Sequence, residues 1–171
     1  TITLVTVEKF SEAMDKFIAG ECDIVTTDGS ALVGRRAVND ALNDWSIFPQ
    51  SPISKEPLGP VYRSNDSMWG DVINWVVYAT IIADEYGVTS ANVDSVDTDA
   101  FPELGRLFGA NDGELQTVMG LSNDAFYNVI KQVGNYDEIY SRNLNPVGLF
   151  REGGANDRWT NGGLIYAPPA R

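Results

Sequence analysis

The chain has 171 residues, with 24 acidic and 12 basic side chains, and its formal net charge is -12. This acidic surplus repels phosphates and no basic tract offsets it, so nucleic acid is not an expected partner. No apolar run is long enough for a membrane-spanning helix. Histidine is absent and Cys22 is the single cysteine, so imidazole catalysis, a thiolate metal cage and an internal disulfide are excluded. We therefore expect no cofactor and no metal site.

The first fifty residues alternate between strand and helix patterns. Residues 2–7 are apolar and β-branched and predict a strand, whereas the apolar spacing over 10–18 predicts a helix that ends at Gly20. Residues 22–27 predict a second short strand, and 31–42 predict a second helix. This strand-helix-strand-helix order favours a parallel sheet, so we expect an α/β fold.

The remainder of the chain predicts a connector followed by helices. Prolines crowd residues 45–63, which indicates an extended crossover between two lobes. Helices are expected over 65–87 and 122–134, and Asn135 with Glu138 three residues later resembles the capping box of a further helix. One face of the first of these helices is expected to pack in the core, and it carries Trp69, Val72, Ile73, Val76, Thr80 and Ala83.

Asp28 is the candidate ligand-binding residue. It follows the second predicted strand and precedes a helix, and ligands of open α/β sheets bind beyond the carboxyl ends of the strands. A carboxylate there, beside the hydroxyls of Thr26 and Thr27, suits an ammonium group. The alternative is that Asp28 only caps the following helix. Position alone does not separate the two interpretations.

Five segments in chain order resemble the general (polar) L-amino-acid-binding proteins of bacterial ABC transporters, which have the periplasmic binding protein type II fold. They are Gly20-Glu-Cys-Asp-Ile-Val-Thr-Thr-Asp28, Ile53-Ser-Lys-Glu-Pro-Leu-Gly-Pro60, Gly87-Val-Thr-Ser-Ala-Asn-Val93, Val133-Gly-Asn-Tyr-Asp137 and Gly162-Gly-Leu-Ile-Tyr-Ala-Pro-Pro169. The resemblance implies a two-lobed clamp with parallel or mixed sheet pieces and a mostly helical C-terminal half. Residues 1–52 would be the C-terminal portion of the second lobe. Residues 53–171 would be that of the first lobe, with a helical extension.

The resemblance also implies a ligand site that this chain only partly contains. Asp28 matches the aspartate that binds the α-ammonium group, and Thr27 lies where a residue often approaches the ligand side chain. The arginine that binds the α-carboxylate belongs to an N-terminal half that is absent here, and no arginine of this chain matches it, including Arg35, Arg36 and Arg63. Cys22 matches a cysteine that, in relatives, is placed to pair with one on a neighbouring strand.

Three functions follow from these residues. The leading one is the substrate-binding component of an ABC importer, which captures free L-amino acids in the periplasm and presents them to a permease. The chain begins without Met or a leader, and we expect it to be a processed or cut product. We expect this chain alone to bind amino acids weakly or not at all, and to self-associate through surfaces left exposed by the missing half. The alternatives are a carboxylate-based dehydratase on the same fold and an interaction or sensor domain without a ligand.

Overall fold

The computed structural model describes residues 2–42, 44–49, 53–111 and 113–171. The chain divides into two compact units, Thr1–Pro57 and Leu58–Arg171. The boundary expected after residue 52 lies outside the described residues. The assignment of the two parts to particular lobes stays a prediction.

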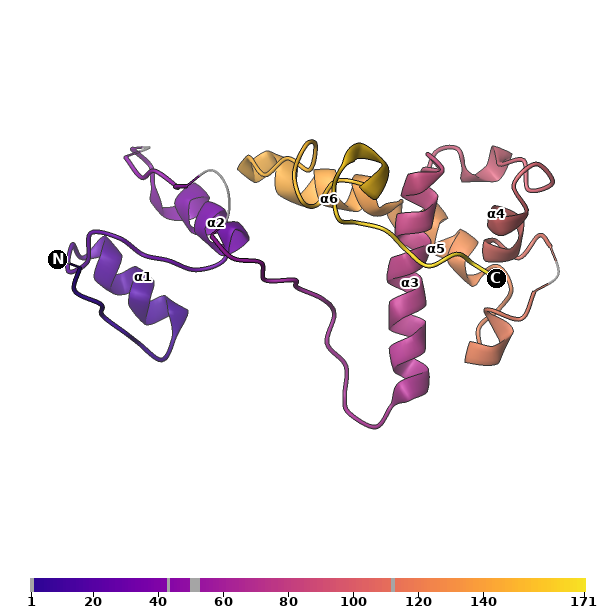
Figure 1. Cartoon of the computed structure of the whole chain (residues 1–171), viewed down its shortest axis with the longest axis horizontal. Coiled ribbons are helices and arrows are strands. Elements are labelled where there is room, and N and C mark those ends of the chain that lie inside the picture. Colours follow the sequence, from indigo (N-terminus) through magenta and orange to yellow (C-terminus); the bar gives the residue numbers. More distant parts are fainter. Residues whose placement is uncertain (1, 43, 50–52, 112) are drawn as a thin grey trace. The chain divides into compact units, whose positions relative to one another are not determined.

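The first unit contains two helices, α1 (Phe10–Ile18) and α2 (Gly29–Asn39) (Figure 1). Helix α1 has the predicted bounds, whereas α2 begins and ends slightly earlier than expected. Gly20 ends α1 as predicted, with a φ of 74° that favours glycine. Met14 of α1 and Val33 of α2 are buried, so each helix contributes an apolar side chain to the interior of this unit.

The predicted strands do not form. Residues 2–7 and 22–27 are irregular (Figure 1), and among the described residues bridge pairing is limited to an isolated contact between Arg158 and Ile165. The sheet expected from the sequence is therefore unconfirmed. The physical reason is that a strand satisfies its N–H and C=O groups only on a neighbouring strand. No described residue supplies one for these two segments.

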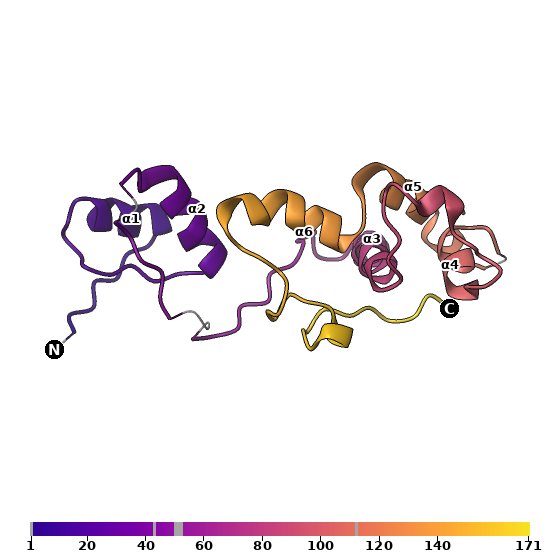
Figure 2. The ribbon, with the colours of Figure 1, turned by 90° about the horizontal axis from the view of Figure 1, so that it is seen from above.

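The second unit is helical. Its helices are α3 (Ser67–Glu85), α4 (Pro102–Leu107), α5 (Ala125–Val133) and α6 (Tyr136–Leu144). Short 3-10 turns lie at Val93–Ser95, Thr117–Met119, Asn145–Val147 and Trp159–Asn161. Helix α3 packs against α5 and α6, and in Figure 2 it is seen nearly end-on, with these two helices on one side and the C-terminal tail on the other. The helices predicted over 65–87 and 122–134 are thus confirmed.

The core of this unit forms around the second half of α3. Its largest fully buried side chains come from helices α3, α4 and α5 and from the loop before α5, and they are Ile82, Leu104, Leu107, Gln116, Phe126 and Ile130. Val72 and Ala83 lie in the core as predicted. Trp69 does not, because its side chain is 53% exposed. It lies in the first turns of α3, whereas the continuous buried stretch of that helix runs from Ala79 to Asp84.

The capping box predicted before α6 is confirmed. The backbone N–H of Glu138 donates to the Asn135 side chain at 2.9 Å, and the Asn135 N–H donates back to the Glu138 carboxylate at 2.9 Å. The amide of Asn135 also donates to the carbonyl oxygen of Val88 at 2.8 Å, and the Ser90 hydroxyl donates to Glu138 at 2.6 Å. The cap therefore ties α6 to the loop that follows α3.

Candidate functional site

Asp28 lies at the N-cap of α2, but its carboxylate does not cap the helix. The residue has φ -54° and ψ 139°, and its carbonyl oxygen accepts the Leu32 N–H at 3.0 Å. Its side chain accepts no capping hydrogen bond. Among the described residues it also makes no side-chain hydrogen bond or ion pair. The half-buried carboxylate of Asp28 is therefore available to an external donor.

The helix behind Asp28 supports a negative charge at this point. The N-terminus of a helix carries a partial positive charge from its unpaired N–H groups. The first turn of α2 contains no acidic residue, and Asp28 stands at its N-cap. The dipole of α2 therefore favours an acidic residue at this position.

Thr27 directly precedes Asp28 and is also half-buried. Its hydroxyl makes no hydrogen bond within the described part of the chain. The structure therefore leaves both predicted ligand-binding residues uncommitted. Their roles in ligand binding stay predictions.

Two basic residues of the first unit are engaged in contacts of their own. The Arg35 guanidinium lies over the ring of Phe10, 5.7 Å from its centroid, and the Lys16 ammonium pairs with Glu21 at 2.8 Å. Cys22 is a free, half-buried thiol, and the pairing expected from the resemblance is not tested. The arrangement around Asp28 can hold an ammonium group. Arg35 and Lys16 are not available to bind a ligand carboxylate, because they already contact Phe10 and Glu21.

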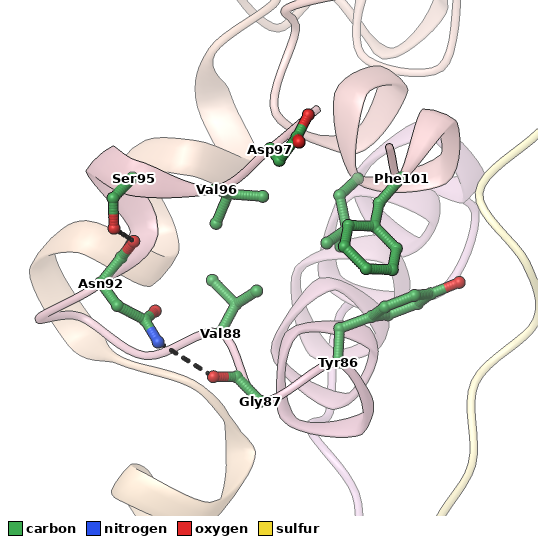
Figure 3. A pocket seen from close by; sticks show the side chains of 9 residues that line it. Tyr86, Gly87, Val88, Asn92, Ser95, Val96, Asp97 and Phe101 are labelled. Atoms are coloured by element: carbon green, nitrogen blue, oxygen red, sulfur yellow. Dashed lines mark hydrogen bonds between the residues drawn. The ribbon is translucent and has the colours of Figure 1, made fainter. Parts of the chain in front are cut away.

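A hollow in the second unit is not suited to an amino acid. It encloses about 180 Å³ between the end of α3, the turn at Val93–Ser95 and α4, and Figure 3 shows the rings of Tyr86 and Phe101 along one wall. Ligand pockets are usually about 300–1,000 Å³ in volume. Asp97 at its rim already accepts the N–H groups of Asp99 and Ala100. The described residues that line the hollow include no basic side chain, so a ligand carboxylate would find no positively charged partner among them.

A wider hollow of about 610 Å³ lies where the chain enters α3. It is lined by Val61, Tyr62, Arg63, Asp66 and Trp69, all of which are exposed. Asp66 is committed to the Trp69 N–H at 3.1 Å as the cap of α3. The hollow is a surface depression without a buried polar group that could orient a ligand.

Sequence reasoning missed a buried charge cluster in the second unit. Arg151 and Asp84 are 5% and 3% exposed, and their charged groups meet at 2.6 Å. Arg151 also lies 3.2 Å from the Asp137 carboxylate, and the Arg158 guanidinium lies 3.8 Å from Asp84. The available signal was Asp84 itself, a charge that directly follows the apolar residues 81–83 on the buried side of a helix.

This cluster is structural. Burial raises the pKa of Asp84, and the hydrogen bond and charge of Arg151 oppose that rise. Perturbed carboxyl groups often mark functional sites, but structural ion pairs produce the same effect. Here the charged partners come from the chain itself, and they hold residues 151–158 against α3.

Comparison with known proteins gives whole-chain relatives, although no family model matches. The chain is 43% identical to the glutamate/glutamine/aspartate/asparagine-binding protein BztA of Rhodobacter capsulatus, with 100% of the chain and 51% of that protein covered. It is 42% identical to the general L-amino acid-binding periplasmic protein AapJ of Rhizobium johnstonii, with 98% and 49% covered. The chain thus spans about half the length of the curated relatives it matches.

A solved structure is similar over the same extent. A periplasmic binding protein of an ABC transporter from Brucella ovis, with glutathione bound, superposes with a TM-score of 0.87 at 41% identity. The superposition covers 98% of this chain and 52% of that one. The names of these relatives describe amino-acid-binding or periplasmic binding proteins of ABC transporters. The five sequence segments indicated the same family.

Proposed function

We propose that this chain, a homologue of the amino-acid-binding periplasmic proteins of ABC transporters, acts in amino-acid uptake as part of a substrate-binding component in the periplasm. Its two units would be portions of the two lobes, and its partner would be an ABC permease. Asp28 would bind the α-ammonium group of the ligand, with Thr27 beside the ligand side chain. Among the described residues, no helix combines the length and hydropathy that a bilayer-spanning segment needs.

The observation that carries the proposal is the uncommitted carboxylate of Asp28. A carboxylate at an N-cap ordinarily accepts a backbone N–H of the first turn. Asp28 occupies the N-cap of α2 without making that bond. Because a hydrogen bond between a carboxylate and an ammonium group is charge-assisted, the site is suited to a primary amine.

The ligands named for the relatives share one chemical group. Glutamate, glutamine, aspartate and asparagine each carry an α-ammonium and an α-carboxylate, and glutathione carries the same pair on its glutamyl residue. A carboxylate at a fixed position in the binding site would recognise the α-ammonium group that all these ligands share. We extend the same ligand class to this chain: L-amino acids, and peptides with a free γ-glutamyl end.

The names of the relatives also bear on the two alternative functions, a dehydratase and a sensor domain without a ligand. BztA and AapJ are named as binding proteins, which favours a binding role over the carboxylate-based dehydratase. The uncommitted Asp28 favours a protein that retains a ligand over a sensor domain without one. No observation of this structure specifically favours either alternative.

The binding strength of this chain alone can be bounded. A hydrogen bond to a charged group contributes about 1.5–3 kcal/mol. A dissociation constant of 1 mM already requires about 4.1 kcal/mol. Since Asp28 is the one ligand contact that we assign to a charged group of this chain, we expect dissociation constants weaker than about 1 mM.

Backbone amide chemical shifts of the 171-residue chain test the assignment. Glutamine titrated into the high millimolar range should shift the amides of Thr27 and Asp28, whereas N-acetylglutamine, which lacks the ammonium group, should not. The variant Asp28→Asn should lose the response, and the matched control Asp23→Asn should keep it. Equal responses in Asp28→Asn and the native chain would contradict the role of Asp28, and micromolar affinity would contradict the single-contact site.

A further inference from the structure

We propose that the hollow between the end of α3, the turn at Val93–Ser95 and α4 docks a basic segment of a partner protein, which inserts one lysine or arginine side chain into it. The described residues that line the hollow include no basic side chain, which disfavours an amino acid but favours a group that carries positive charge alone. Because the hollow lies in the second unit, its occupation does not depend on the role of Asp28 in the first unit.

Part of the lining is apolar and aromatic. Val88, Val96 and Leu104 line the hollow, and Val88 and Leu104 also belong to the core of the second unit. The rings of Tyr86 and Phe101 meet edge to face beside these side chains, with their centroids 5.7 Å apart (Figure 3). The methylene chain of a lysine or arginine packs on apolar groups, and its cationic end is attracted to an aromatic face.

The carboxylate of Asp97 stands at the rim of this lining. Its Oδ1 atom accepts the N–H groups of Asp99 at 3.2 Å and of Ala100 at 3.0 Å, which fix the side chain. Within the described part of the chain its Oδ2 atom accepts no hydrogen bond, and the residue is exposed. An ammonium or guanidinium group can therefore donate a charge-assisted hydrogen bond to that free oxygen.

The charge around the hollow is negative. Residues 64–105 contain no lysine or arginine, whereas Asp97, Asp99 and Glu103 follow one another closely there. Glu103 accepts the hydroxyl of Tyr86, one of the lining residues, at 2.8 Å. Among the described residues, none of these three carboxylates takes part in an ion pair. Carboxylates that lack an internal cation attract a partner of opposite charge.

Basic side chains on the adjoining helices have other partners. Lys131 of α5 pairs with Asp94 at 2.6 Å, and Arg106 of α4 donates to the carbonyl oxygen of Ala170 at 3.1 Å. These two cations therefore leave the carboxylate at the rim of the hollow to an external partner.

A basic polypeptide fits this surface better than a small amine or a second copy of the chain. The hollow encloses about 180 Å³, below the usual range of small-molecule pockets. Asp99 and Glu103 do not line it, so one small amine cannot engage all three carboxylates. A second copy carries a formal charge of -12 and would be repelled. We therefore commit to a partner segment that presents several basic residues.

Titration of the isotope-labelled full chain with a short peptide tests this site. The probe is the acetylated and amidated peptide Lys-Ser-Arg-Ser-Lys, and its control carries neutral citrulline for the arginine and norleucine for both lysines. The probe should shift the backbone amides of Val88, Val96 and Phe101 at about 50 mM salt, and this effect should weaken strongly at about 0.5 M salt. The neutral control should leave the same amides unmoved.

Three variants assign the binding to named side chains. Asp97→Asn keeps the oxygen that accepts the two loop N–H groups but removes the charge, so it should weaken binding about two- to fivefold. Phe101→Leu keeps an apolar wall but removes the aromatic face, and it should weaken binding by about the same factor. Asp71→Asn changes the charge equally at an exposed position of α3 that does not line the hollow, and it should bind as the native chain does.

The proposal is overturned by any of three results. The first is equal binding of the neutral peptide, and the second is equal affinity in Asp97→Asn and Asp71→Asn. The third is a shift of the same amides that follows the concentration of the chain alone, because a second copy would then be the occupant.

Discussion

The buried cluster around Asp84 allows a quantitative prediction. We consider Arg151→Met, which keeps most of the side-chain volume and removes the charge. The substitution eliminates the 2.6 Å contact to Asp84, the 3.2 Å contact to Asp137 and the hydrogen bond to the carbonyl oxygen of Asn156, also 2.6 Å long. It also removes the contact between the guanidinium and the face of the Tyr136 ring. The central carbon of the guanidinium lies 4.8 Å from the centroid of that ring.

The expected loss of unfolding free energy is about 3 kcal/mol. Removal of one partner of a buried ion pair typically costs about 3–5 kcal/mol, because a buried charge is left without compensation. We expect the lower end, because burial already raises the pKa of Asp84 and the orphaned carboxyl can take up a proton. Arg158, 3.8 Å away, also supplies some remaining positive charge. Urea unfolding followed by far-ultraviolet circular dichroism measures the change.

Two further variants make this prediction refutable. Arg142→Met is the matched control, since Arg142 contacts the Val133 carbonyl oxygen from an exposed position, and it should cost under about 1 kcal/mol. The double variant Asp84→Leu/Arg151→Met should be more stable than the sum of the single losses implies. Equal losses for Arg151→Met and Arg142→Met, or strict additivity in the double variant, would refute the reasoning.

Three other predictions concern the second unit and use the same unfolding assay. Gly109→Ala should destabilise far more than Gly120→Ala: both residues have φ near 75°, but a Cβ at Gly109 would overlap the Asn123 backbone and one at Gly120 meets open space, so equal losses would contradict this packing. Asn135→Ala should cost about 2–3 kcal/mol, because it removes a cap and leaves the buried Val88 carbonyl oxygen unpaired, whereas Asn143→Ala on the exposed face of α6 should cost little. The hydrogen bond that the Gly153 N–H donates to the Asp157 carboxylate is the main cause that lowers the pKa of Asp157 below its ordinary 3.8. A second hydrogen bond from the Arg158 N–H also lowers this pKa, whereas burial raises it. A lowered folded-state pKa stabilises the fold above the unfolded value, so the deficit of Asp157→Asn should be full above pH 3.8 and disappear as pH falls through the folded-state pKa; a deficit independent of pH would contradict this.

The helices were predictable from the sequence, whereas strand pairing was not. The apolar spacing over 10–18 and the capping pair Asn135 and Glu138 are local signals, and both predictions are confirmed. The patterns at 2–7 and 22–27 are equally local, but a strand also needs a neighbour. A pattern in one segment cannot indicate whether that neighbour is available.

The candidate site shows a similar division. The position of Asp28 before a helix was predictable, and the structure adds that its carboxylate makes no cap. The pairing of Asp84 with Arg151 was not predictable, because the two residues lie 67 positions apart in the sequence and only the folded chain brings them together. Trp69 was wrongly expected in the core, since a helical stripe does not reveal how far along the helix its neighbours extend.

The most direct measurement of the central claim is the carbon chemical shift of the Asp28 side-chain carboxyl group during titration with L-glutamine. We expect that signal to move with the ligand and to stay unmoved with N-acetylglutamine, while the carboxyl signal of Asp23 stays unmoved with both. A stationary Asp28 carboxyl signal at ligand concentrations that shift other residues of the first unit would contradict the account.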